Sequence, residues 1–166
     1  LVRVLAAEAL LPANVELVHA DARAVDWGAW IDEGVAAGQT VRVIANLPYS
    51  VATPLLRVFL DHRDRLADWS VMLQSEVAAR MTAKVGDDDY GSLAVIHALT
   101  SDVETLARLA PERFFPRPKV ESSFVRVWPR RTPLLAQGEL EPVEQLVRAA
   151  FTQRRKVVTN GLARIA

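Results

Sequence analysis

The chain contains 166 residues, of which 51% are hydrophobic and 24% are charged, a composition typical of one globular domain or slightly more. It contains no cysteine, which excludes disulfide scaffolds, thiolate metal sites and cysteine nucleophiles. No stretch reaches the roughly 18 apolar residues needed to span a bilayer, and no signal peptide is recognisable. These features predict a cytoplasmic protein with no membrane association.

The net charge of zero conceals an asymmetry between two parts of the chain. Residues 1–110 contain 9 Lys and Arg against 15 Asp and Glu, whereas residues 111–166 contain 11 against 5. A basic end on a neutral chain is typical of a protein that binds a polyanion. The alternative is that two solvated faces differ in charge without binding anything.

The first half of the chain alternates between helical and strand-like patterns. Apolar residues at helical spacing predict a helix over residues 1–11. Short apolar runs predict buried strands at 15–19, 41–45 and 69–73. Further helices are predicted at 28–37, 51–61 and 75–83. Pro54 is expected in the first turn of its helix, and Ser75 is expected to cap the next helix. This order predicts a parallel α/β sheet covered on both faces.

The second half has less regular patterns. Residues 92–100 fit either a helix or a strand, and residues 102–109 have mixed periodicity. Prolines break residues 113–119 into a loop, whereas residues 122–128 alternate as a strand does. Two more helices are predicted, at 142–151 and 154–166.

Polar residues follow two of the predicted strands, at the edge where open α/β sheets bind ligands. Asp21 follows the strand at 15–19, and its carboxylate can accept a hydrogen bond from a base amine or a ribose hydroxyl. A turn or cap residue is the alternative interpretation. The sequence Asn-Leu-Pro-Tyr at 46–49 follows the strand at 41–45.

This tetrapeptide can hold a planar amine. The Asn46 side chain and the carbonyl of Leu47 offer two acceptors, Pro48 stiffens the turn, and Tyr49 adds an aromatic face. Two acceptors orient the lone pair of an exocyclic base amine toward an incoming electrophile. An Asn-x-Pro turn without chemistry is the alternative.

Five segments, in the same order, resemble the ribosomal RNA adenine N6,N6-dimethyltransferase family. They are 46–56 (NLPYSVATPLL), 72–80 (MLQSEVAAR), 90–95 (YGSLAV), 114–122 (FFPRPKVES) and 151–160 (FTQRRKVVTN). The last two segments are most similar to the bacterial enzymes that dimethylate two adjacent adenines near the 3′ end of 16S RNA. The erythromycin-resistance methyltransferases, which act on 23S RNA, are the first alternative, and a non-catalytic RNA-binding assembly factor is the second.

The resemblance implies a Rossmann-like, S-adenosylmethionine-dependent methyltransferase fold of the α/β class. Residues 1–130 would be a partial catalytic domain, and residues 131–166 would begin a C-terminal helical domain. A cluster of prolines and basic residues between Pro129 and Pro142 favours a boundary there. The implied activity is methyl transfer from S-adenosylmethionine to N6 of adenines, by a monomer acting on the small-subunit precursor.

The resemblance also implies roles for individual residues at the cofactor. Asp21, with Ala22 beside it, matches the position that contacts the adenine of S-adenosylmethionine. Asn46 would lie between the cofactor and the target amine. The carbonyl of Leu47 or Pro48 would complete the hold on that amine.

Further roles concern the RNA. Tyr49 and Phe114 would enclose the flipped adenine, although without the resemblance Phe114 and Phe115 are interpreted as a hydrophobic plug under a loop. The cations expected to contact phosphates are Arg113, Arg117, Lys119, Arg154, Arg155 and Lys156. A solvated helix face is the alternative for the last three.

No metal site is expected. His19, His62 and His97 have no second histidine or carboxylate at ligand spacing. The three aspartates at 87–89 lack the spacing of a calcium loop and are interpreted as a solvated turn.

The sequence departs from the family pattern at its beginning. A complete member starts with a glycine-rich loop that approaches the methionine end of the cofactor. Here no two of the seven glycines are separated by a single residue. We therefore expect an internal fragment that lacks two strands, binds S-adenosylmethionine weakly or not at all, and has an unprotected sheet edge.

Overall fold

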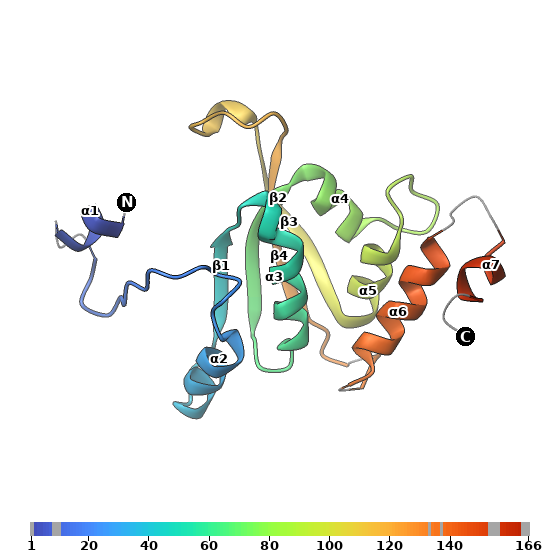
Figure 1. The fold of residues 1–166 in the computed structure, drawn as a ribbon, viewed down its shortest axis with the longest axis horizontal. Coiled ribbons are helices and arrows are strands. Elements are labelled where there is room, and N and C mark those ends of the chain that lie inside the picture. Colours follow the sequence, from blue (N-terminus) through green and yellow to red (C-terminus); the bar gives the residue numbers. More distant parts are fainter. Residues whose placement is uncertain (1, 8–10, 133, 137, 153–156, 164–166) are drawn as a thin grey trace.

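A computed structural model describes residues 2–7, 11–132, 134–136, 138–152 and 157–163. Its four strands form one mixed sheet in the order β1-β2-β4-β3 (Figure 1). Strand β1 (Arg42–Asn46) runs parallel to β2 (Asp68–Gln74). Strand β4 (Ser122–Pro129) lies between β2 and β3 (Ser101–Leu109) and is antiparallel to both. The parallel pairing predicted for the first half is therefore confirmed for β1 and β2.

The helices follow the predicted positions closely in most places. The longer ones are α2 (Trp27–Ala36), α3 (Tyr49–Asp61), α4 (Ser75–Thr82), α5 (Ser92–Thr100) and α6 (Leu140–Phe151). The short ones are α1 (Val2–Ala7), α7 (Thr159–Leu162) and a 3-10 turn, η1 (Pro111–Arg113). The predicted helix at 154–166 is thus much shorter where it is described, and residues 154–156 and 164–166 lie outside the described residues.

The described helices pack on one face of the sheet, so the expectation of cover on both faces is wrong for this part of the chain. Trp69 and Val71 of β2 are fully buried, and Phe59 of α3 packs beside Trp69 with ring centroids 6.5 Å apart. Helix α2 joins the same side through Trp27, whose ring lies 5.5 Å from that of Phe59. On the opposite face Ile44 is 80% exposed.

The strand predicted at 15–19 is wrong, since these residues are exposed coil. A strand needs a neighbour to pair its N–H and C=O groups. Among the described residues β1 pairs only with β2, and no strand lies beside residues 15–19. An apolar run alone therefore does not form a strand here.

Two local predictions need correction. Helix α3 begins at Tyr49, which places Pro54 beyond the first turn. Proline has no N–H, so the carbonyl of the exposed Ser50 receives no helical hydrogen bond from position 54. Gln74, not Ser75, is the N-cap of α4. The Ser75 hydroxyl instead lies 2.8 Å from the hydroxyl of Ser123, which ties α4 to β4.

The two undecided segments are now resolved. Residues 92–100 form α5, and the following segment forms β3 with a bulge between Thr105 and Ala107. A bulge shifts the alternation of faces by one residue, which explains the mixed periodicity of this segment.

The buried His97 makes stability depend on pH. The ring is 1% exposed, with Nδ1 2.9 Å from the hydroxyl oxygen of Ser101, and burial lowers its pKa to about 4. A histidine in the unfolded chain has a pKa of about 6.5, so the unfolded chain takes up a proton at a higher pH than the folded chain does. The contribution of neutral His97 to the free energy of unfolding is therefore complete above pH about 6.5 and is lost as the pH falls toward about 4. The loss is of the order of 3 kcal/mol.

Urea unfolding across this pH range checks the prediction. The His97→Gln variant has no titrating ring, so its free energy of unfolding is expected to fall less steeply between pH about 6.5 and about 4.5. Parallel pH profiles of the two proteins would contradict the role of His97.

Candidate functional site

The sheet brings two of the predicted functional segments to one edge. Asn46 ends β1 and pairs with Met72 in the parallel strand β2. At that end of β2, Gln74 pairs with Ser122, and Ser122 also pairs with Leu109, the last residue of β3. The loop at 110–121 therefore leaves the sheet at the edge where Asn46 lies, and it projects beyond that edge in Figure 1.

The tetrapeptide at 46–49 joins β1 directly to α3. The Asn46 side chain is exposed, whereas that of Leu47 is buried in the core, 8% exposed. Pro48 is the N-cap of α3, and its carbonyl accepts a hydrogen bond from the Val51 N–H at 3.0 Å. Tyr49 begins α3, and its side chain lies outside the described part. Burial of Leu47 fixes the position of the exposed Asn46 beside it.

The loop at 110–121 carries aromatic and basic side chains. Phe114 is half-buried, while Phe115 is completely exposed at 101%, so Phe115 is no plug under a loop. Arg113 and Lys119 are exposed. Arg117 is also exposed and forms an ion pair with Glu112. The cations predicted at 154–156 lie outside the described residues.

Asp21 lies in the coil before α2 and forms a local turn. Its Oδ1 accepts a hydrogen bond from the Arg23 N–H at 2.9 Å, and its Oδ2 lies 2.7 Å from the Arg23 guanidinium. Hydrogen bonds from the Arg23 side chain and backbone lower the pKa of Asp21 to about 2. The Ala22 carbonyl accepts a hydrogen bond from Trp27 Nε1 at 2.8 Å. These contacts are those of the turn residue given as the alternative for Asp21.

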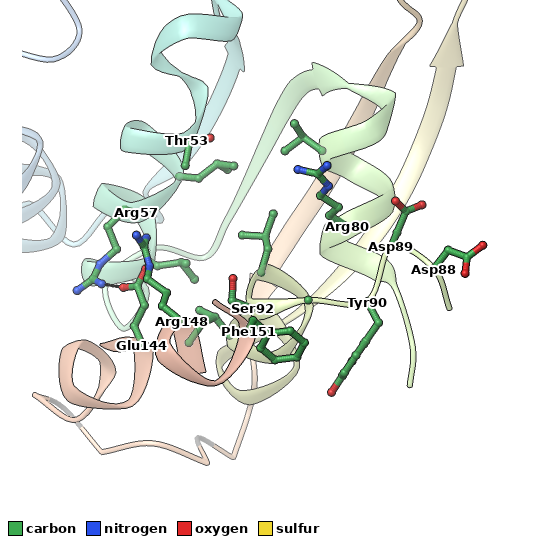
Figure 2. Close-up of a pocket in the computed structure, with 16 residues that line it drawn as sticks. Thr53, Arg57, Arg80, Asp88, Asp89, Tyr90, Ser92, Glu144, Arg148 and Phe151 are labelled. Carbon is green, nitrogen blue, oxygen red and sulfur yellow. Dashed lines mark hydrogen bonds and ion pairs between the residues drawn. The ribbon is translucent and has the colours of Figure 1, made fainter. Parts of the chain in front are cut away.

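The helices enclose a cavity that the sequence analysis missed. It measures about 460 Å³, lies between α3, α4, α5 and α6, and is lined by none of the predicted site residues (Figure 2). Glu144 of α6 lies between Arg57 of α3 and Arg148 and forms ion pairs with both. The cavity lining contains three arginines (Arg57, Arg80 and Arg148) and three acidic residues (Asp88, Asp89 and Glu144), so its formal charges sum to zero.

In the sequence, this cavity is indicated only by residues that recur at helical spacing along α3. Thr53, Leu56, Arg57 and Leu60 recur at the spacing of one face of α3 and line the cavity together. Its other walls come from helices distant in the sequence, which no local pattern reveals.

Neither a metal cluster nor a membrane span is found in the described part of the chain. No three His, Asp or Glu side chains there gather as metal ligands. Asp87 instead accepts a hydrogen bond from the Lys84 N–H at 2.8 Å, which makes a turn. No helix among the described residues has the length and apolarity to cross a bilayer.

Comparison with known proteins gives consistent matches. The sequence pattern of a family described as "Ribosomal RNA adenine dimethylase" matches residues 1–166. The chain is 40% identical over 151 residues to the "Ribosomal RNA small subunit methyltransferase A" of Acidithiobacillus ferrooxidans, covering 91% of this chain and 55% of the relative. It is 44% identical over 128 residues to the protein of that name from Methylococcus capsulatus, covering 77% and 49%. The chain thus spans about half the length of the curated relatives it matches.

Two solved structures resemble the fold. A dimethyladenosine transferase from Plasmodium falciparum superposes with a TM-score of 0.76 at 26% identity, covering 96% of this chain and 53% of that one. The 23S rRNA methyltransferase ErmE superposes with a TM-score of 0.67 at 22% identity, covering 98% and 60%. The second likeness concerns the fold alone.

Proposed function

Because the chain belongs to the ribosomal RNA adenine dimethylase family and has its Rossmann-like methyltransferase fold, we propose that it transfers methyl groups to N6 of adenines in ribosomal RNA. The proposed targets are two adjacent adenines near the 3′ end of 16S RNA. Relatives about 40% identical carry a small-subunit name, which favours this target over the 23S RNA of the alternative. The proposed donor is S-adenosylmethionine.

The observation that carries the proposal is the placement of Asn46. Its carboxamide is exposed at the carboxyl edge of β1, held by the buried Leu47, on the same edge as the aromatic loop. The Pro48 carbonyl already accepts one hydrogen bond, from the Val51 N–H, which leaves it one lone pair, so we assign the second acceptor to the Leu47 carbonyl. Two acceptors on one amine orient its lone pair toward the methyl donor.

Two aromatic residues from segments that reach this edge are assigned to the target base. Phe114, half-buried in the loop at 110–121, would pack on one face of the flipped adenine. Tyr49, at the first position of α3, is assigned to the other face. Both residues are within the segments that resemble the family.

Exposed polar residues are proposed for the methyl and adenine ends of the cofactor. When bound, S-adenosylmethionine supplies an electrophilic methyl group. The exposed Asn46 offers an acceptor beside the transfer, and Asp21 with Ala22 is proposed to contact the adenine. The Asp21 carboxylate must exchange its ion pair with Arg23 for that contact, and both groups are solvent-exposed, so the exchange costs little.

Basic residues are proposed to bind the RNA backbone. Arg113, Arg117 and Lys119 lie within the loop at 110–121, on both sides of its aromatic residues in the sequence, and the cluster at 154–156 is proposed to extend the contact. Contacts of this kind position RNA without reading its sequence and weaken as salt rises. The proposed partner is the small-subunit precursor, bound in the cytoplasm by a monomer whose residues 1–130 are catalytic and whose residues 131–166 begin a helical domain.

Transfer of labelled methyl groups tests the proposal. The chain is incubated with S-adenosylmethionine and with small-subunit or large-subunit particles that lack these methyl groups, and nucleosides are then analysed. The proposal requires dimethyladenosine in small-subunit RNA, and small-subunit particles methylated beforehand are the control. Such a product would also overturn the expectation that this chain binds the cofactor weakly.

The other outcomes separate the alternatives. Product in the large-subunit RNA alone would favour the 23S enzyme. Binding of the particles without any transfer would contradict the catalytic proposal for this chain and favour the RNA-binding assembly factor.

A further inference from the structure

Phe115 presents its ring to solvent in the loop that leaves the sheet at the edge carrying Asn46. Its exposed fraction is 101%, whereas its neighbour Phe114 is half-buried. Single apolar side chains on a surface are common and do not by themselves mark a site. The position of its loop, which leaves the sheet at the edge that carries Asn46, and the cations next to Phe115 in the sequence therefore have to carry the argument.

The loop that carries Phe115 is held firmly at its base. Leu109 and Ser122 pair across the sheet where the loop begins and ends. The Ser75 N–H donates to the Glu121 carbonyl at 3.0 Å, which fastens the loop to the start of α4. The Phe114 N–H donates to the Pro111 carbonyl at 3.2 Å and closes a turn before the ring. Phe115 is thus presented by an anchored loop that projects from the sheet (Figure 1).

Cations lie on both sides of this ring in the sequence. Arg113 precedes it, and Arg117 and Lys119 follow it, all three exposed. Alternation of an aromatic platform with phosphate-binding cations is the arrangement by which proteins bind single-stranded nucleic acid. A base can stack on the ring while its phosphates meet the cations, because base and backbone lie on opposite sides of a nucleotide. An acidic lipid surface would meet the same charges but would not need a planar ring.

We propose that Phe115 is a base-stacking residue distinct from the two that enclose the target adenine. It takes an unpaired base next to the target and thereby positions the RNA strand along the loop at 110–121. The inference rests on the proposed function, since it takes single-stranded RNA as the ligand. Because Phe115 does not touch the reacting atoms, it acts as a positioning residue.

Binding of a fluorescein-labelled decaadenylate to the chain tests this, followed by anisotropy at several salt concentrations. Phe115→Ala is expected to raise the Kd about tenfold, the loss of one stacked base, without changing the slope of log Kd against log salt. Phe115→Trp is expected to stay within about twofold of the unsubstituted chain, because any aromatic face stacks. Arg113→Ala, the comparison variant, is expected to reduce that slope by about 1.

Several results would overturn the inference. They are an unchanged Kd for Phe115→Ala, an equal loss in Phe115→Trp and Phe115→Ala, or no binding of the decaadenylate by the unsubstituted chain. Binding to vesicles of anionic lipid that depends on Phe115, without binding of the decaadenylate, would assign the ring to a membrane instead. The midpoint of thermal unfolding of Phe115→Ala is expected to match that of the unsubstituted chain, so a change in Kd cannot be attributed to loss of the fold.

The outcome is separable from that of the proposed function. If the unsubstituted chain transfers methyl groups and Phe115→Ala binds the decaadenylate with an unchanged Kd, only the stacking role is contradicted. If Phe115→Ala binds RNA more weakly and the unsubstituted chain transfers no methyl group, the stacking role is supported and the proposed enzymatic activity is contradicted.

Discussion

Replacing Asn46 with alanine is expected to lower kcat for methyl transfer by about 100- to 1000-fold while leaving the Kd for ribosomal RNA unchanged. The carboxamide is exposed at the end of β1 and is proposed to hold the target amine. An alanine there removes one of two acceptors, so the amine lone pair is no longer oriented toward the donor. The residues proposed to contact the RNA backbone lie elsewhere, in the loop at 110–121 and at 154–156, so we expect those contacts to be retained.

Steady-state transfer kinetics and RNA titration on the same protein measure the two effects. The matched control is Asn14→Ala, which removes the same side chain at an exposed position in the coil before α2, and it is expected to leave both values unchanged. A Kd that rises together with the fall in kcat would show that Asn46 contributes to RNA binding and does not only orient the target amine.

Replacing Phe59 with alanine is expected to lower the free energy of unfolding by about 3–5 kcal/mol. The ring is 0% exposed and packs between Trp27 of α2 and Trp69 of β2, with centroids 5.5 Å and 6.5 Å away. Its removal leaves a cavity that the neighbouring rings, from α2 and β2, can fill only partly. Domains of this size are commonly stable by about 5–15 kcal/mol, so this one change removes a large share.

Urea unfolding followed by far-UV circular dichroism measures the loss. The control is Phe115→Ala, the same chemical change at a fully exposed ring, which is expected to alter stability by less than about 0.5 kcal/mol. Similar effects of the two substitutions would mean that Phe59 is not the centre of this core.

The sequence predicted those elements whose pattern depends on their own residues. Strands β1, β2 and β4 lie within one residue of their predicted bounds, because each carries a short apolar run that is largely buried in β2 and β4 and buried at Val43 in β1. The run at 15–19 also carries three apolar residues, Val15, Leu17 and Val18, but it is coil, because a strand also depends on a partner that local sequence does not specify. Residues 92–100 were undecidable because α5 is apolar on most sides.

Prediction of the site followed the same division. The position of residues 46–49 at a strand end follows from the strand itself and was predicted. The contrasting exposure of Phe114 and Phe115, adjacent rings in one loop, depends on the path of that loop and could not be predicted. The ion pair between Arg57 and Glu144 joins helices far apart in the sequence, so no spacing rule reveals it.

The loop at 110–121 can be replaced without disturbing the sheet, because its two ends are paired with each other. Its two ends meet at one rung of the sheet, the pair Leu109 and Ser122, so the distance between them stays the same whatever lies in between. The entropy of closing a loop grows only slowly with its length. Evolution can therefore lengthen, shorten or replace this segment while the sheet that holds Asn46 stays unchanged. Grafting it between relatives with different RNA targets should transfer preference for a substrate without transferring chemistry.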